Sequence, residues 1–239
     1  MSLMRAGEVQ ARYRLGHRDF SDAILLEADL TEAILSEADF SHADLRQSRL
    51  GRVDFGRAQL QRADLSESIL WGTNFQYADL SFARFRDADL TGARLTHANL
   101  YGANFIKAIL CGADLRNTNL EDALLIETDL CPSSSQSVDL SNANLKFADL
   151  SYSQLSGAIG RNANFSQARL CRAKLSINYH ANARATDLSG ANFQGADLSF
   201  ADLSGAILRN ANFSDADLTG TILHSTDLQG AIMPDTFID

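Results

Sequence analysis

Histidine and cysteine are the residues best suited to proton transfer, nucleophilic attack or metal binding, and this 239-residue chain has few of them. The histidines are widely spaced, and none has a nucleophile or carboxylate at a spacing typical of a catalytic set. The cysteines are odd in number and lack the paired spacing of a disulfide framework or a zinc site. The set consists of His17, His42, His97, His180, His224, Cys111, Cys131 and Cys171.

The sequence also lacks the motifs that are typical of phosphate binding and of acyl transfer. The sequence contains no Gly-Lys pair, hence no P-loop, and no G-x-S-x-G elbow. Aspartate and asparagine do recur in front of apolar residues, as in Ala78-Asp79-Leu80, but almost every repeat unit has one. Such regularity is typical of a turn requirement, because these side chains bond their own backbone. We therefore expect no catalytic site, no cofactor and no metal.

A five-residue repeat organises the chain. Every fifth residue from Phe20 to Leu130 is leucine or phenylalanine, and a small residue, usually alanine, stands two positions before each. This period fits neither an α-helix nor a plain strand. The units must then be equivalent, with the large and small apolar residues pointing inward and the other three positions facing water. A chain of such units coils about an axis and builds one continuous core.

The unit Ala-(Asp/Asn)-(Leu/Phe)-X-X resembles that of the pentapeptide-repeat family. The resemblance implies an all-β fold, a right-handed quadrilateral parallel β-helix with four units per coil, so that residues 20 apart stack on one face. Residues Leu3 to Leu15 contain helix formers and no repeat, with Gly16 as a stop signal, and they predict a short N-terminal capping α-helix.

A single domain over residues 1–239 follows, with an N-terminal cap over 1–18, about ten coils over 19–233 and a C-terminal end over 234–239. Two segments interrupt the repeat, near 131–137 and 176–183. The first lacks the apolar centre at position 135 but keeps the phase, which we interpret as a loop that replaces one face. The second shifts the phase by three residues.

Charge and composition exclude several functions. The net charge is −9, which argues against direct nucleic-acid binding, since that needs a basic surface, and permits imitation of nucleic acid. No apolar run is long enough to span a membrane, and no secretory signal is evident. Unpaired cysteines then favour a cytoplasmic protein.

Apolar residues at outward positions are the candidate functional feature. The 20-residue rule places Ile106 and Ile126 one above the other, with Arg86 and Lys146 in the coils before and after. Phe82 and Tyr101 lie on the preceding face. The predicted protein-contact patch, apolar with a basic rim, consists of Arg86, Tyr101, Ile106, Ile126, Lys146 and Phe147. Scattered exposed apolar residues are the alternative interpretation.

Two branches of the family imply different partners. Non-repetitive segments resemble a branch that acts in cyanobacterial heterocyst differentiation, which implies binding of the transcription regulator HetR and relief of its inhibition by a peptide. The alternative is the branch that mimics DNA and binds DNA gyrase; a C-terminal dimerisation helix is not evident, and we expect a monomer. The first resemblance rests on residues 45–51, 69–72, 110–112, 132–134, 170–172 and 231–235.

Overall fold

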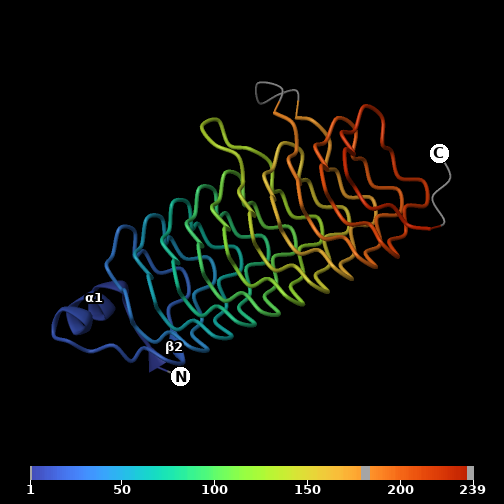
Figure 1. Ribbon diagram of the computed structural model, residues 1–239. Coiled ribbons are helices and arrows are strands. Elements are labelled where there is room, and N and C mark those ends of the chain that lie inside the picture. Colours follow the sequence, from blue (N-terminus) through green and yellow to red (C-terminus); the bar gives the residue numbers. More distant parts are fainter. Residues whose placement is uncertain (1, 179–183, 236–239) are drawn as a thin grey trace.

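The computed structural model describes residues 2–178 and 184–235, and it shows a chain wound into a stack of coils along one axis (Figure 1). Parallel backbone bridges join residues 20 apart, such as Asp19 to Asp39 and Asp39 to Gln59. One coil therefore contains four five-residue units, as the resemblance to the family implied. Bridges in the same line as Asp19 continue to Ile232, so the column contains ten coil-to-coil steps.

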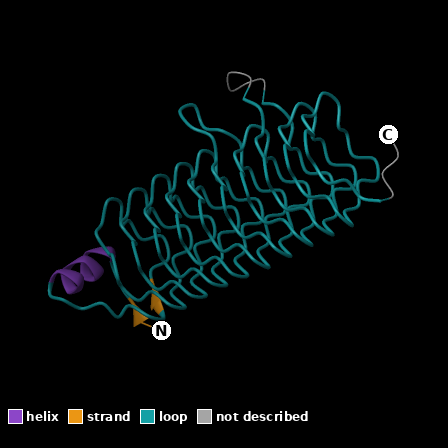
Figure 2. Ribbon diagram, in the orientation of Figure 1, coloured by secondary structure: helices purple, strands orange, loops and turns teal. Residues whose placement is uncertain are grey.

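Each unit contributes one bridging residue and one tight corner. At Leu25, the backbone N–H donates to the carbonyl of Asp44 in the next coil at 2.7 Å. The carbonyl of Leu25 accepts from Ala28 at 3.1 Å, closing a four-residue turn whose third residue, Glu27, has a φ of 57°. A positive φ at this position is typical of a type II turn. Because strands are reduced to single bridges, almost the whole chain is drawn as loop in Figure 2.

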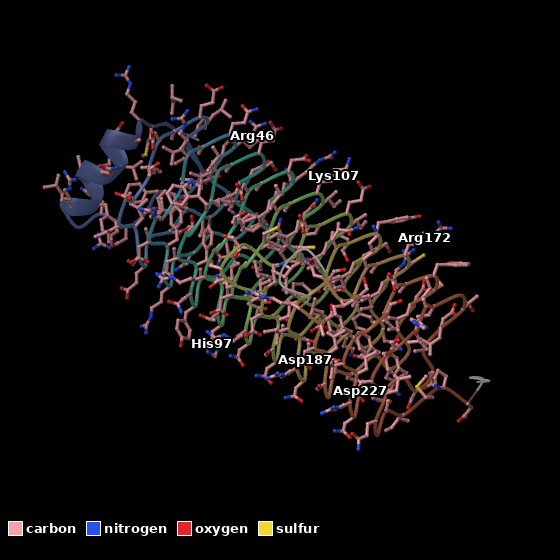
Figure 3. All side chains as sticks on the ribbon, turned by 90° about the horizontal axis from the view of Figure 1, so that it is seen from above. Arg46, His97, Lys107, Arg172, Asp187 and Asp227 are labelled. Carbon is pink, nitrogen blue, oxygen red and sulfur yellow. The ribbon has the colours of Figure 1, made fainter. Side chains whose placement is uncertain are left out.

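Four faces and four corners result, and we number them in chain order. The first, second, third and fourth faces begin with the outward residues Asp19, Ile24, Asp29 and Ile34. The corner that follows a face takes the number of that face. Figure 3 shows that second-corner residues Arg46, Lys107 and Arg172 and the fourth-face residue Asp187 lie along opposite edges of the stack.

The core is a column of leucine and phenylalanine side chains, and the alanines two positions before them pack beside this column. The central residues and the small residues two positions before them are almost all buried. Phenylalanines of adjacent coils stack, with ring centroids 5.1 Å apart for Phe20 and Phe40 and 4.7 Å for Phe85 and Phe105. Where serine replaces alanine, its hydroxyl is satisfied, since Ser48 Oγ donates to the carbonyl of Leu25 at 2.8 Å.

An asparagine ladder runs along the first face. Each side-chain amide donates through Nδ2 to the Oδ1 of the asparagine in the preceding coil, at 3.0–3.3 Å. The chain of bonds ends when Asn99 Nδ2 donates to Asp79 Oδ1 at 3.0 Å. The ladder residues are Asn99, Asn119, Asn144, Asn164, Asn192 and Asn212.

The N-terminal end is covered as predicted by a short helix. Strand β1 (Ser2–Leu3) pairs in parallel with β2 (Ala23–Ile24), and helix α1 (Ala6–Arg14) follows β1. Val9 of α1 is fully buried, and Tyr13 Oη donates to the carbonyl of Ser36 at 3.0 Å. The helix thus seals the first coil, whose edge would otherwise expose core and backbone.

Both interruptions of the repeat lie at the third corner (Figure 1). Asp114 bridges Asp139, and Leu124 bridges Asp149, so the coil that contains 131–137 has 25 residues and keeps all four faces. Our interpretation that this loop replaces a face was wrong, because the loop is added at a corner. Ile159 bridges Asp187, so the second interruption enlarges a 20-residue coil to 28. Residues 179–183 of that interruption lie outside the described residues.

The last coil leaves part of its core accessible. Leu218, Leu223, Leu228 and Met233 are only partly buried, whereas Pro234 is buried. The predicted C-terminal end includes residues 236–239, which lie outside the described residues. Among the residues that are described, no helix is long and apolar enough to cross a membrane.

Candidate partner-binding surface

The corners hold exposed aromatic residues that the fold does not require. The third residue of most turns has a positive φ, a conformation that suits glycine and asparagine and is costly for bulky side chains. Five aromatic residues nevertheless occupy this position with φ of 58–62°, and 45–56% of each is exposed. They contribute little to the core, so their presence points to a role at the surface. These residues are Tyr77, Phe82, Phe147, Tyr152 and Phe200.

The predicted column of Arg86, Ile106 and Ile126 is present at the second corner. Asp87 N–H donates to the carbonyl of Ile106 at 3.1 Å, and Lys107 N–H donates to that of Ile126 at 3.1 Å. The two isoleucines are half-buried, and Arg86 is exposed.

Lys146 does not lie above Ile126, contrary to our expectation. The 25-residue coil shifts the alignment by one unit, so the carbonyl of Ser151 accepts from Glu127 at 3.1 Å. The carbonyl of Lys146 accepts instead from Asp122, also at 3.1 Å. Lys146 and Phe147 therefore lie at the first corner, in the column of Tyr101. The 20-residue rule failed here because it assumed that the loop added no length to the coil.

Leu124 joins the two columns, and the sequence analysis did not single it out. It occupies the outward position of the second face, which lies between the first and second corners, and 38% of it is exposed. Aspartate or asparagine usually fills that position, so the leucine in Ala123-Leu124-Leu125 could have identified this residue from the sequence. We define the mid-solenoid patch as Tyr101, Ile106, Leu124, Ile126 and Phe147.

The rim of this patch carries both signs of charge, whereas we expected a basic rim. Arg86 Nε lies 3.1 Å from Asp87 Oδ2, and Lys107 Nζ lies 3.8 Å from Glu127 Oε2. Lys146 Nζ lies 4.6 Å from the centroid of the Phe147 ring. Exposed pairs of this kind add little stability but orient a partner of complementary charge.

Phe82 and Tyr101 lie in adjacent coils of the first corner, as predicted. Their rings meet edge to face with centroids 5.3 Å apart. A hydrogen bond to Asp122 and the negative charge of that residue raise the pKa of Tyr101, so the phenol remains neutral. The pair extends the apolar surface around the first corner.

The thiols of Cys111 and Cys131 lie in adjacent coils but are poorly suited to nucleophilic attack. Gly112 N–H donates to the carbonyl of Cys131 at 3.2 Å, which places Cys111 and Cys131 in adjacent coils at the third corner. Both thiols are free, and burial, reinforced by the charge of Asp129, raises each pKa to about 12. The described part of the chain contains no group of three histidine, cysteine, aspartate or glutamate side chains that could hold a metal ion.

Comparison with known proteins identifies the repeat. The family model for pentapeptide repeats matches eight copies, over residues 19–52, 54–92, 93–130, 139–176, 179–210 and 196–233. No curated protein matches the chain.

Solved structures extend the likeness to the whole chain. HetL, a pentapeptide repeat protein involved in heterocyst differentiation regulation from the cyanobacterium Nostoc sp. strain PCC 7120, is 51% identical. The match covers 99% of this chain and 100% of HetL, with a TM-score of 0.97. QnrB1, a plasmid-mediated fluoroquinolone resistance protein, is 20% identical with a TM-score of 0.44, over 89% of this chain and 91% of QnrB1. The chain belongs to the pentapeptide repeat family.

Proposed function

We propose that this protein is a non-enzymatic, protein-binding scaffold in the cytoplasm that regulates heterocyst differentiation. It binds the transcription regulator HetR and counteracts the peptide that inhibits HetR. The observation that carries the proposal is the near full-length likeness to HetL, at 51% identity. A fold that gives every inner residue to the core leaves only its outer surface for function, which agrees with a binding role.

The contact surface in this proposal is the mid-solenoid patch with its charged rim of Arg86, Lys107 and Lys146. Apolar residues here occupy positions that other coils give to polar residues, and the patch lies on one continuous side of the stack. An apolar centre with a polar, charged rim is the usual composition of a protein interface.

A titration of purified HetR against variants of the patch tests this proposal. Ile106→Glu/Ile126→Glu and Leu124→Glu place charge in the interface while leaving the buried positions unchanged. Each variant should weaken binding by more than about 2 kcal/mol if these residues are hot spots. Ile222→Glu is the matched control, because Ile222 is an outward apolar residue on the third face, 50% exposed and remote from the patch.

A second measurement tests the regulatory part. HetR is bound to its DNA site and displaced with the inhibitory peptide; added parent protein should restore DNA binding, and Leu124→Glu should not. Absence of any binding to HetR would contradict the proposal. Binding to gyrase that is lost when Asp87, Glu121 and Asp122 are neutralised would instead establish the DNA-mimic alternative.

A further inference from the structure

Arginine and aromatic side chains pair at three of the four corners of two neighbouring coils. In each pair the guanidinium carbon lies 4.5–5.7 Å from the ring centroid, within the range of a cation–π contact. The pairs are Arg52 with Trp71 at the third corner, Arg57 with Tyr77 at the fourth and Arg62 with Phe82 at the first.

The backbone makes room for these rings. A Cβ atom on Gly51 would lie 2.7 Å from the Trp71 ring, and one on Gly102 would lie 2.7 Å from the Phe82 ring. The Trp71 and Phe82 rings therefore pack directly against glycine backbone, in space that a Cβ atom would fill. Tyr77 stacks on His97 instead, with centroids 4.9 Å apart and an angle of 3° between the planes. The aromatic side chains are therefore fixed in place although they are exposed.

Two of the three pairs border the first face. Tyr77 precedes this face and Phe82 follows it in the same coil, with Asp79 between them. The rows Arg57–Tyr77–His97 and Arg62–Phe82–Tyr101 consequently run along both edges of one face. We call these six residues the arginine–aromatic surface.

The two guanidinium groups of this surface are not held in ion pairs: among the described residues, neither Arg57 nor Arg62 has a carboxylate partner. Asp79, the carboxylate between the rows, is already occupied by hydrogen bonds from Gln61 Nε2, Asn99 Nδ2 and the backbone of Ser81, at 2.8–3.0 Å.

The same region differs in charge from the rest of the chain. Residues 41–100 contain eight arginines and seven acidic residues, a net charge of +1, while the remaining residues hold 13 basic and 23 acidic residues, a net of −10. Residues 1–18 and 161–175 are also basic, so these coils are one of three stretches at which an approaching acidic partner is not repelled.

We propose that the arginine–aromatic surface docks an acidic segment of the protein partner. A guanidinium stacked on a ring is held in position yet keeps its N–H edge free for a carboxylate, and the ring shields the contact from water. The surface joins the mid-solenoid patch through Tyr101, so one partner can cover both. The inference rests on the proposed function, since the segment belongs to the regulator bound there.

Fold-neutral variants are available for the test. Asparagine occupies the same turn position at Asn117 and Asn142, with φ of 58° and 59°, so Tyr77→Asn/Phe82→Asn should keep the coil intact. Arg57→Gln/Arg62→Gln removes the charges. Phe200→Asn is the matched control, because Phe200 is also about half exposed and has an arginine partner (Arg172 at 5.3 Å) and a glycine neighbour, Gly220.

The experiment is a titration of full-length HetR against these variants at low and moderate salt, with thermal melts to confirm folding. Both double variants should weaken binding at least about tenfold, and Arg57→Gln/Arg62→Gln should also reduce the salt dependence. Phe200→Asn should bind as the parent does.

Three results would overturn the inference. Parent-like binding by both double variants, with binding lost in Ile106→Glu/Ile126→Glu, would refute it and leave the proposed function standing. No binding of the parent to HetR would refute both. Tight binding of a single-stranded oligothymidine to the parent, lost in the double variants, would make the surface a nucleic-acid site instead.

Discussion

Individual residues in this protein have sharply separated roles, because the inward and outward positions alternate within each unit of five. Leu115 is completely buried, while Arg116 is exposed and pairs with Asp114 at 2.6 Å. Neighbours in sequence thus differ in what they contribute to the free energy of unfolding. Sequence alone predicts this division, since it follows from the period and from no other information.

Replacing Leu115 by alanine should lower the free energy of unfolding by about 2–5 kcal/mol, because it leaves a cavity among close-packed side chains. Replacing Arg116 by alanine should change the free energy of unfolding by only about 0.5 kcal/mol, since an exposed ion pair contributes little. Denaturant titration of both variants measures the difference. Equal losses would mean that the inward and outward positions have been exchanged.

Cys111 and Cys131 should resist alkylation in the native protein. Burial raises their pKa to about 12, so almost no thiolate is present at pH 8. Their reaction with iodoacetamide should be slower than in the unfolded chain by at least about a hundredfold. Peptide mapping of the labelled protein measures each cysteine separately, and equal rates in the two states would contradict this prediction.

Corners are the elements in which this solenoid tolerates change. Both interruptions occur at the third corner, and between them Gly157 fits closely, since a Cβ there would lie 2.9 Å from Pro132 and 3.0 Å from Asn178. Arg184 Nη1 also donates to Ser137 Oγ at 3.2 Å, joining the two segments. The faces on either side continue undisturbed, so an insertion at a corner changes alignment without changing the core.

Deletion of residues 132–136 should restore a 20-residue coil. Cys131 and Ser137 would then form the two-residue corner between Leu130 and Val138, and serine already occupies such a corner at Ser225 with a φ of 58°. We expect a folded protein whose free energy of unfolding changes by about 1 kcal/mol or less. Circular dichroism and denaturant titration check this outcome. A loss beyond about 3 kcal/mol would show that the loop stabilises the stack.

At the scale of the whole molecule, sequence predicted the stack but not the alignment after the first loop. The period gave the inward residues, and the helix formers before the repeat gave the capping helix. The family resemblance gave four units per coil and, with it, the column of Arg86, Ile106 and Ile126. Neither could give the length that a loop adds to its coil, and the positions of Lys146 and Phe147 were wrong for that reason. The right-handed coil stays a prediction.

Outward aspartates make the stability of the stack dependent on pH. A hydrogen bond from Arg46 lowers the pKa of Asp44, and at Asp187 hydrogen bonds from Ser189 and Arg161 outweigh the opposing effect of burial. A carboxyl whose pKa is lower in the folded state stabilises that state above its unfolded pKa, near 3.9, and the contribution is lost as the pH falls through the folded value.

The free energy of unfolding should therefore be constant near neutral pH and decline from about pH 5 downward. Denaturant titrations between pH 7 and pH 3 measure it. Asp44→Asn and Asp187→Asn should each make the decline shallower, whereas a stability that rises on acidification would contradict the assignment.

The asparagine ladder gives the first face a net dipole along the axis of the stack. All six amides point their N–H groups toward the N-terminal end and their oxygens toward the other end, so their dipoles add along the axis. Hydrogen bonds aligned in this way polarise one another. The positive end of this chain of dipoles terminates at the carboxylate of Asp79, as the N-terminus of a helix meets an anion. The first face therefore carries one continuous chain of aligned amide dipoles, which ends at the Asp79 carboxylate between the two arginine rows. Asn144→Leu would divide this chain into two shorter ones.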